Sequence, residues 1–120
     1  MIKSYRDLLV WQKSMLLVTQ VYQVTQTLPK EELYGLTLQI RRSAVSIPSN
    51  IAEGYGRNST SDYLRFLQIA CGSLYELQTQ LEICLNLEYL PREYFDNLYE
   101  QSEEIEKMLI SLIKKVGVHR

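Results

Sequence analysis

The stretch YLRFLQIACGSLYELQTQLEIC, from Tyr63 to Cys84, decides the fold. Its apolar residues recur at alternating steps of four and three, which is the period of one face of an α-helix. Those residues are Tyr63, Leu67, Ala70, Leu74, Leu77, Leu81 and Cys84. Ser59 and Asp62 precede them at the spacing of a helix N-cap and its capping-box partner, with Asp in the usual place of Glu. The sequence therefore predicts a helix over residues 60–88.

Three further segments of similar length show the same periodicity, separated by short breaks that contain proline or glycine. Proline is favourable in the first turn of a helix, and glycine commonly follows the last turn. The predicted helices span residues 5–27, 30–54, 60–88 and 91–116 of a single domain, 1–120. Because short connections place consecutive helices antiparallel, the expected fold is all-α, an up-down-up-down four-helix bundle. Gly54 and Gly117 are expected to end the second and fourth helices, and Pro48 is expected to kink the second.

The first predicted helix carries more apolar surface than one bundle requires. Its two apolar seams are Leu8, Trp11, Met15, Val18 and Tyr22, and Val10, Leu17, Val21, Val24 and Leu28. Together they cover about half of the helix, against a stripe of about 100° on an ordinary surface helix. The surplus predicts an oligomer interface. Trp11 and Tyr22 are candidate packing or assembly residues, together with Gly72, which lies among small residues where a neighbouring backbone could approach closely.

Composition limits the class of protein. The chain has 120 residues, 46% of them hydrophobic and 22% charged, and a net charge of −1. It is therefore not strongly basic, as dedicated nucleic-acid coats and arms usually are. No stretch approaches the roughly 18–20 apolar residues of a membrane helix, and the N-terminal residues lack the apolar core of a signal peptide. A cytoplasmic location without membrane contact is expected, with Cys71 and Cys84 as reduced thiols.

Catalytic and cofactor patterns are missing from the sequence. The only histidine, His119, lies near the end of the chain and is a poor candidate for a general base. Gly54 and Gly56 fall far short of a phosphate-binding glycine loop, and a di-iron bundle would need Glu-x-x-His motifs. We therefore expect no enzyme, no metal, no cofactor and no small-molecule substrate.

Charge is distributed unevenly along the chain. Residues 39–67 contain Arg41, Arg42, Arg57 and Arg65 against Glu53 and Asp62, a local net charge of +2. Residues 88–106 contain seven carboxylates and one arginine, a net charge of −6. The four arginines are candidate phosphate contacts for RNA or DNA, with Tyr55 and Tyr63 available for stacking. The alternative is that they form ion pairs with carboxylates of this chain or of a neighbouring subunit.

A second group of residues surrounds the end of the second predicted helix. Asn50 and Glu53 are three residues apart and share a helix face, and Gly54 and Gly56 follow. We interpret the four as a structural motif, whose polar side chains bond backbone groups near Pro48 or hold Arg57 across the turn.

The ordered motifs resemble a known family, the bacterial four-helix-bundle proteins encoded in intervening sequences of 23S rRNA genes. The resemblance extends from Asp7 to about Leu90. It is carried by Asp7-Leu8, Val10-Trp11-Gln12, Tyr34-Gly35-Leu36, Gln39 to Ala44, Ser46-Ile47, Asn50 to Gly54, Gly56-Arg57, Phe66-Leu67 and Gly72 to Leu77. It implies an antiparallel bundle that assembles as a ring, typically a homopentamer, in the bacterial cytoplasm.

Some relatives are accessory proteins of diversity-generating retroelements, which bind a reverse transcriptase and nucleic acid through a strongly basic ring. This sequence departs from that pattern because it is slightly acidic overall. The leading hypothesis is a non-enzymatic oligomeric scaffold or adaptor associated with RNA, DNA or a nucleic-acid-processing protein. The alternative hypothesis is a purely protein-binding adaptor whose arginines form structural or intersubunit ion pairs.

Overall fold

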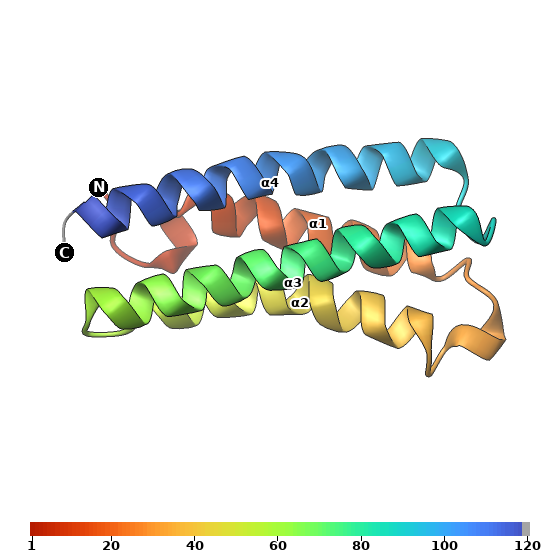
Figure 1. Ribbon diagram of the computed structural model, residues 1–120, viewed down its shortest axis with the longest axis horizontal. Helices are drawn as coiled ribbons and strands as arrows, with labels where there is room; N and C mark the ends of the chain where they lie inside the picture. The colour runs from red at the N-terminus through yellow and green to blue at the C-terminus, as the bar shows by residue number, and fades with distance from the viewer. Residues whose placement is uncertain (119–120) are drawn as a thin grey trace.

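Residues 1–118 are described by the computed structural model, and they form four α-helices and two short 3-10 helices with no β-strand (Figure 1). The elements are η1 (Tyr5–Asp7), α1 (Leu9–Thr25), η2 (Lys30–Glu32), α2 (Leu36–Tyr55), α3 (Thr60–Asn86) and α4 (Arg92–Val118). Consecutive α-helices run in opposite directions, so the start of α1 and the end of α4 lie at the same end of the bundle (Figure 1). The predicted all-α class with four helices is confirmed for this part of the chain; His119 lies outside it.

The first α-helix begins four residues later than predicted. Tyr5–Asp7 forms the separate turn η1, and Leu8 is extended, with φ −73° and ψ 123°. A capping box closes this turn: the Ser4 N–H donates to Asp7 Oδ2 (3.2 Å), and the Arg6 N–H donates to Ser4 Oγ (3.1 Å). The prediction of a helix from residue 5 was wrong because side chains satisfy these backbone groups outside any α-helix.

The second α-helix likewise begins at Leu36 and not at residue 30. Pro29 precedes the short turn η2, and Gly35 separates that turn from α2 with φ −109° and ψ −111°. The carboxylate of Glu32 reaches over the break, where its Oε1 accepts a hydrogen bond from the Leu36 N–H (3.1 Å). A side chain from the preceding turn thus satisfies a backbone donor at the start of α2.

Two glycines predicted to stop helices lie inside them. Helix α2 continues through Pro48 and Gly54 to Tyr55, and the Gly56 N–H then bonds the carbonyls of Ala52 (3.3 Å) and Glu53 (3.2 Å). Helix α4 continues through Gly117 to Val118. A glycine ends a helix only where the chain must leave the helical conformation, and no glycine among residues 1–118 has a positive φ.

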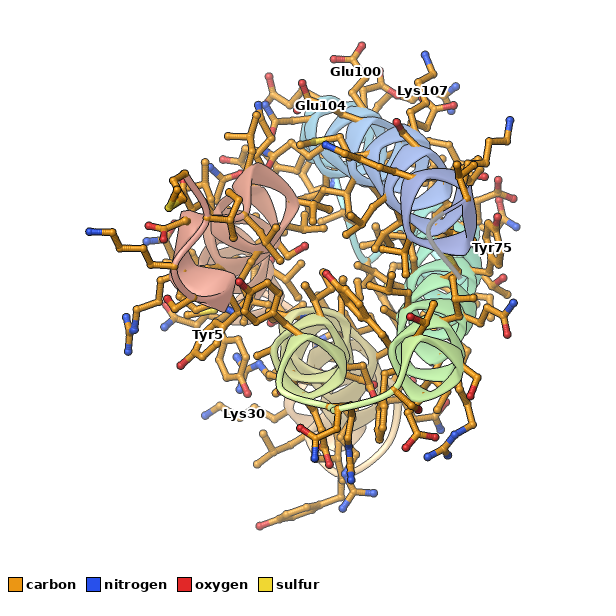
Figure 2. All side chains as sticks on the ribbon, turned by 90° about the vertical axis from the view of Figure 1, so that its left-hand side faces the viewer. Tyr5, Lys30, Tyr75, Glu100, Glu104 and Lys107 are labelled. Carbon is orange, nitrogen blue, oxygen red and sulfur yellow. The ribbon has the colours of Figure 1, made fainter. Side chains whose placement is uncertain are left out.

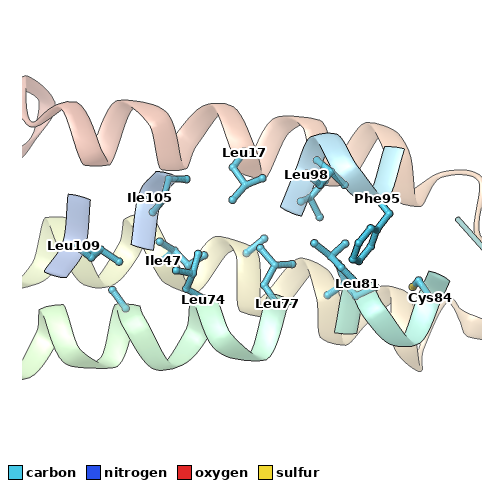
Figure 3. Close-up of a cluster of buried hydrophobic side chains, with 14 of the residues drawn as sticks. Leu17, Ile47, Leu74, Leu77, Leu81, Cys84, Phe95, Leu98, Ile105 and Leu109 are labelled. Atoms are coloured by element: carbon cyan, nitrogen blue, oxygen red, sulfur yellow. The ribbon is translucent and has the colours of Figure 1, made fainter. Parts of the chain in front are cut away.

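The core contains the predicted seams of all four helices (Figure 3). On α1 one of the two seams lies mostly inside the core: Leu17 and Val21 have no exposed surface, and Val24 is half-buried. The other seam lies at the margin of the bundle, where 42% of Met15 and 40% of Tyr22 stay exposed. Ser102, the polar member of the α4 seam, is buried; its Oγ donates to the Tyr99 carbonyl (2.6 Å) and accepts from Gln78 Nε2 (3.1 Å). A single chain therefore leaves part of the apolar surface of α1 uncovered.

Candidate functional site

The four candidate arginines form two separate pairs. Arg41 and Arg42 lie on the first half of α2, whereas Arg57 follows its end and Arg65 lies in the first turns of α3. Fifteen residues separate Arg42 from Arg57, which at the helical rise corresponds to about 22 Å along the bundle. The structure therefore does not bring the four arginines together into one patch.

Arg57 and Arg65 stabilise the turn between α2 and α3. Arg57 Nη2 lies 2.7 Å from Glu53 Oε2, and Arg65 Nε lies 3.8 Å from Asp62 Oδ1. Both guanidinium groups also lie 4.7 Å from the ring centre of Phe66, a cation–π distance. Each of these two arginines therefore has a carboxylate and an aromatic ring beside it within the chain.

Arg41 connects α1 to α2. Its Nε donates to Thr25 Oγ1 (3.0 Å) and its Nη2 to the Tyr22 carbonyl (3.3 Å). The guanidinium lies 4.6 Å from the ring centre of Tyr22. Thr25 Oγ1 in turn donates to the Val21 carbonyl (2.7 Å), so the contact is anchored on the backbone of α1. Arg41 thus holds the exposed ring of Tyr22 in place.

Arg42 is exposed, and among residues 1–118 no carboxylate lies within ion-pair distance of it. Both Arg41 and Arg42 line a surface groove of about 560 Å³ between α1, α2 and the connection that precedes α2, which we call the Arg42 groove. Its apolar lining is Tyr22, Leu33, Tyr34, Leu38 and Val45. Tyr34 is 87% exposed and Val45 38% exposed. The groove therefore offers an available positive charge beside uncovered apolar surface.

The polar residues of the motif at the end of α2 make both kinds of contact that were predicted for them: Asn50 bonds a backbone carbonyl near Pro48, and Glu53 pairs with Arg57. Glu53 holds Arg57 across the turn. Asn50 Nδ2 donates to the carbonyl (2.8 Å) and to Oγ (2.9 Å) of Ser46, whose Oγ is 2.7 Å from Ser73 Oγ on α3. Asn50 therefore belongs to a polar connection between α2 and α3.

Gly54 makes the close approach between helices that was expected at Gly72. A Cβ at Gly54 would lie 2.8 Å from Phe66 Cβ, whereas one at Gly72 would meet nothing within 4 Å. Gly56, the other motif glycine, caps α2. A role for Gly72 inside one chain is therefore wrong, because its surroundings are open solvent; an intersubunit role remains a prediction.

Sequence and structure comparisons both point to one family. The family model of the 23S rRNA-intervening sequence protein matches residues 6–111. The chain belongs to this family. It is also similar to a solved structure, a protein of unknown function from the S23 ribosomal protein family of Bacteroides thetaiotaomicron, at 33% identity and a TM-score of 0.82. That match covers 88% of this chain and 95% of the other. No curated protein matches the sequence of this chain.

The remaining assembly candidate of this 23S rRNA-intervening sequence protein, Trp11, is half-buried. Its ring meets Tyr5 edge-on at 5.2 Å between ring centres, and the Arg6 guanidinium lies 5.6 Å from both rings. Trp11 therefore packs the turn η1 against α1. Together with Tyr22 it belongs to the half-exposed seam of α1, so both residues are available at the margin of the bundle.

The sequence analysis did not identify Leu33 and Tyr34 as site residues that line the groove. The available signal was a pair of large apolar residues directly before Gly35, in a break between helices.

As for metal binding, residues 1–118 contain no group of three or more His, Cys, Asp or Glu placed to hold a metal ion. Over the same range, no helix combines the length and the hydropathy that a membrane span requires.

Proposed function

We propose that the chain is a non-enzymatic helical scaffold of the cytoplasm that assembles with copies of itself and binds another protein. A ring of five subunits is the assembly that the family resemblance implies. The intrachain contacts of the arginines support the proposal: Arg41, Arg57 and Arg65 all have partners within the chain. Around Arg42, exposed aromatic and aliphatic side chains remain, a composition that is typical of protein–protein interfaces.

One observation favours a second candidate function, association with RNA or DNA. Arg42 has no carboxylate partner among the described residues, and Tyr34 lies in the same groove with most of its surface exposed. A phosphate on Arg42 and a base against Tyr34 would combine the two usual contacts to single strands. One such arginine per subunit binds weakly, and repetition around an oligomer would multiply the effect.

Light scattering on a sizing column, with absorbance at 260 and 280 nm across the same peak, tests both functions. A mass several times the 14.1 kDa of one chain, without excess absorbance at 260 nm, supports the protein scaffold. Excess absorbance at 260 nm that is lost at high salt assigns nucleic acid to the oligomer. A monomer contradicts the proposed assembly.

Replacing Arg41 and Arg42 together with alanine separates the two functions further. A loss of thermal stability is expected under either function, because Arg41 joins α1 to α2. For the protein scaffold, the double variant also dissociates. For the nucleic-acid function, the same variant keeps its mass and loses the salt-dependent part of its RNA affinity.

A further inference from the structure

A second groove lies between the start of α1 and the second half of α4, on a different edge of the bundle from the Arg42 groove. It has a volume of about 360 Å³. Its lining includes Leu8, Leu9, Lys107, Met108, Leu112 and Lys115. We call it the Lys107 groove.

The floor of the Lys107 groove is aliphatic because of the way in which α1 begins. Leu8 is extended between η1 and α1, so the helix starts at Leu9, and 56% of Leu9 remains exposed. On α4, Met108 and Leu112 are four residues apart and share one face. Both are only half-buried, as is Leu8. The bundle therefore leaves a strip of aliphatic surface open to solvent between these two helices.

Two lysines flank this strip. Lys107 and Lys115 are exposed, and among residues 1–118 no carboxylate lies within ion-pair distance of either ammonium group. Lys107 lies on the outer side of α4 (Figure 2). Eight residues separate the two lysines, which corresponds to about 12 Å along the helix. The groove thus presents two available positive charges beside uncovered aliphatic surface.

The carboxylates of the surrounding segments are engaged elsewhere. Asp7 Oδ2 accepts hydrogen bonds from two backbone N–H groups (2.8 and 3.2 Å). Glu104 Oε1 lies 3.0 Å from Lys13 Nζ, in an ion pair that crosses from α4 to α1. Glu106 accepts a hydrogen bond from a tyrosine of α3, and Glu103, three residues earlier, shares that side of α4. A partner must therefore supply the negative charge that complements the lysines.

The composition of the groove favours a helix of another protein as the occupant. Two neighbouring helices form a groove into which the side-chain ridges of a third helix can pack, and amphipathic helices bind proteins in this way. Met108 suits such a contact because its flexible thioether adapts to different side chains. None of the described residues that line the groove is aromatic, so a nucleic acid would find no ring on which to stack a base.

We propose that the Lys107 groove binds an acidic amphipathic helix of another protein. The aliphatic stripe of that helix packs on Leu9, Met108 and Leu112, and one carboxylate lies at each lysine. Two carboxylates seven or eight residues apart match the spacing of the lysines. The inference goes beyond the proposed function, because it adds a partner-binding surface that is separate from the Arg42 groove.

A synthetic peptide tests the inference by fluorescence anisotropy. The probe is a fluorescein-labelled helical peptide with one stripe of leucines, flanked by two glutamates seven residues apart. The double variant K107E/K115E is expected to raise the Kd of this peptide at least about tenfold. Leu9→Gln is expected to raise it as well, without changing its salt dependence, because it removes apolar contact and no charge.

Two controls isolate the contribution of the lysines. The variant K30E/R92E changes the net charge by the same amount outside the groove and is expected to bind the peptide like the wild type. A peptide with glutamine in place of both glutamates is expected to bind the wild type and K107E/K115E equally. Circular dichroism checks that every variant is helical.

The other outcomes overturn the inference in different ways. If the wild type does not bind the peptide, or if K107E/K115E binds it as the wild type does, the groove is not the site. Loss of binding in Arg42→Glu alone assigns the peptide to the Arg42 groove, which overturns the inference and supports the proposed function. A lower mass of K107E/K115E in light scattering assigns the groove to a second copy of the chain. Loss of absorbance at 260 nm in that variant assigns it to nucleic acid.

Discussion

Gly54 on α2 faces Phe66 on α3 so closely that a Cβ at Gly54 would lie 2.8 Å from the Cβ of Phe66. It would also lie 3.2 Å from Tyr63 Cδ1 and 3.3 Å from the Tyr63 carbonyl oxygen. Because Phe66 Cβ is fixed to the helix backbone, it cannot turn aside, and the two helices would have to separate. Gly54 therefore sets the distance between α2 and α3 at the end of the bundle where Arg57 and Arg65 surround Phe66.

Gly54→Ala is expected to lower the free energy of unfolding by about 1–3 kcal/mol, the usual cost of overpacking. Gly72→Ala is the matched control, because a Cβ there meets nothing within 4 Å. Its higher helix propensity is expected to raise the free energy of unfolding by up to about 1 kcal/mol. Urea denaturation measures both, and equal stability of the two variants would contradict the close approach. Light scattering of Gly72→Ala also checks whether Gly72 lies between subunits.

Arg41→Ala is expected to lower the free energy of unfolding by about 1–2 kcal/mol, because it removes hydrogen bonds from a charged group and a cation–π contact. Arg42→Ala is expected to change it by no more than about 0.5 kcal/mol, as is usual for exposed side chains without partners. Thermal or urea denaturation below the concentration of assembly makes the comparison. A larger loss in Arg42→Ala than in Arg41→Ala would overturn the assignment of Arg41 as the link between α1 and α2.

Asn50→Ala is expected to lower the free energy of unfolding by about 1 kcal/mol, since Asn50 donates two hydrogen bonds to Ser46 in a partly buried position. Glu53→Ala, three residues further along α2, removes only an exposed ion pair and is expected to lower the free energy of unfolding by less than about 0.5 kcal/mol. Urea midpoints of the two variants decide the order. The reverse order would show that the ion pair at the turn matters more than the polar connection between α2 and α3.

The stability of the protein is expected to fall at alkaline pH. Burial, followed by the charge of Glu32, raises the pKa of the Cys84 thiol from 9.0 to about 11. A thiol with a higher pKa in the folded state contributes stability that is complete below pH 9 and is lost as the pH rises through about 11. Urea midpoints between pH 8 and 11 measure the loss.

Cys84→Ala provides the control for that titration. Its stability is expected to fall less steeply over the same pH range, even if the smaller side chain lowers the stability at pH 8. Burial also raises the pKa of Tyr63, and this shift has the same sign and is present in both proteins. Parallel pH profiles would contradict the role of Cys84.

The helical periodicity of the sequence predicted the class, the number of helices and most of the core, because a residue's burial in a bundle follows from its place on the helix face. Periodicity does not say which of two seams on α1 faces the core, since both have the same spacing. Only the packed bundle distinguishes Leu17, fully enclosed, from Met15 at the margin. The starts of α1 and α2 were missed because Asp7 and Glu32 reach backbone donors several residues away.

Sequence proximity also misled the grouping of the arginines. Arg42 and Arg57 belong to one short stretch, yet a helix of this length separates their positions by about 22 Å. The partners of Arg41 and Arg65 illustrate the same limit: Asp62 is close in sequence to Arg65, whereas Thr25 is 16 residues from Arg41 and on another helix. Local charge can be counted from a sequence, but long-range hydrogen bonds require the fold.

Because the bundle has an even number of antiparallel helices, the chain ends at the same end of the bundle at which it begins (Figure 1). A domain fused to either side would therefore project from the same pole. The opposite pole carries the two loops around Gly35 and Glu88. If copies stand in parallel, every fused domain would be displayed on one rim of the particle, beside the α2–α3 turns, and the α1–α2 and α3–α4 loops would lie on the other rim, which makes the assembly a two-sided platform.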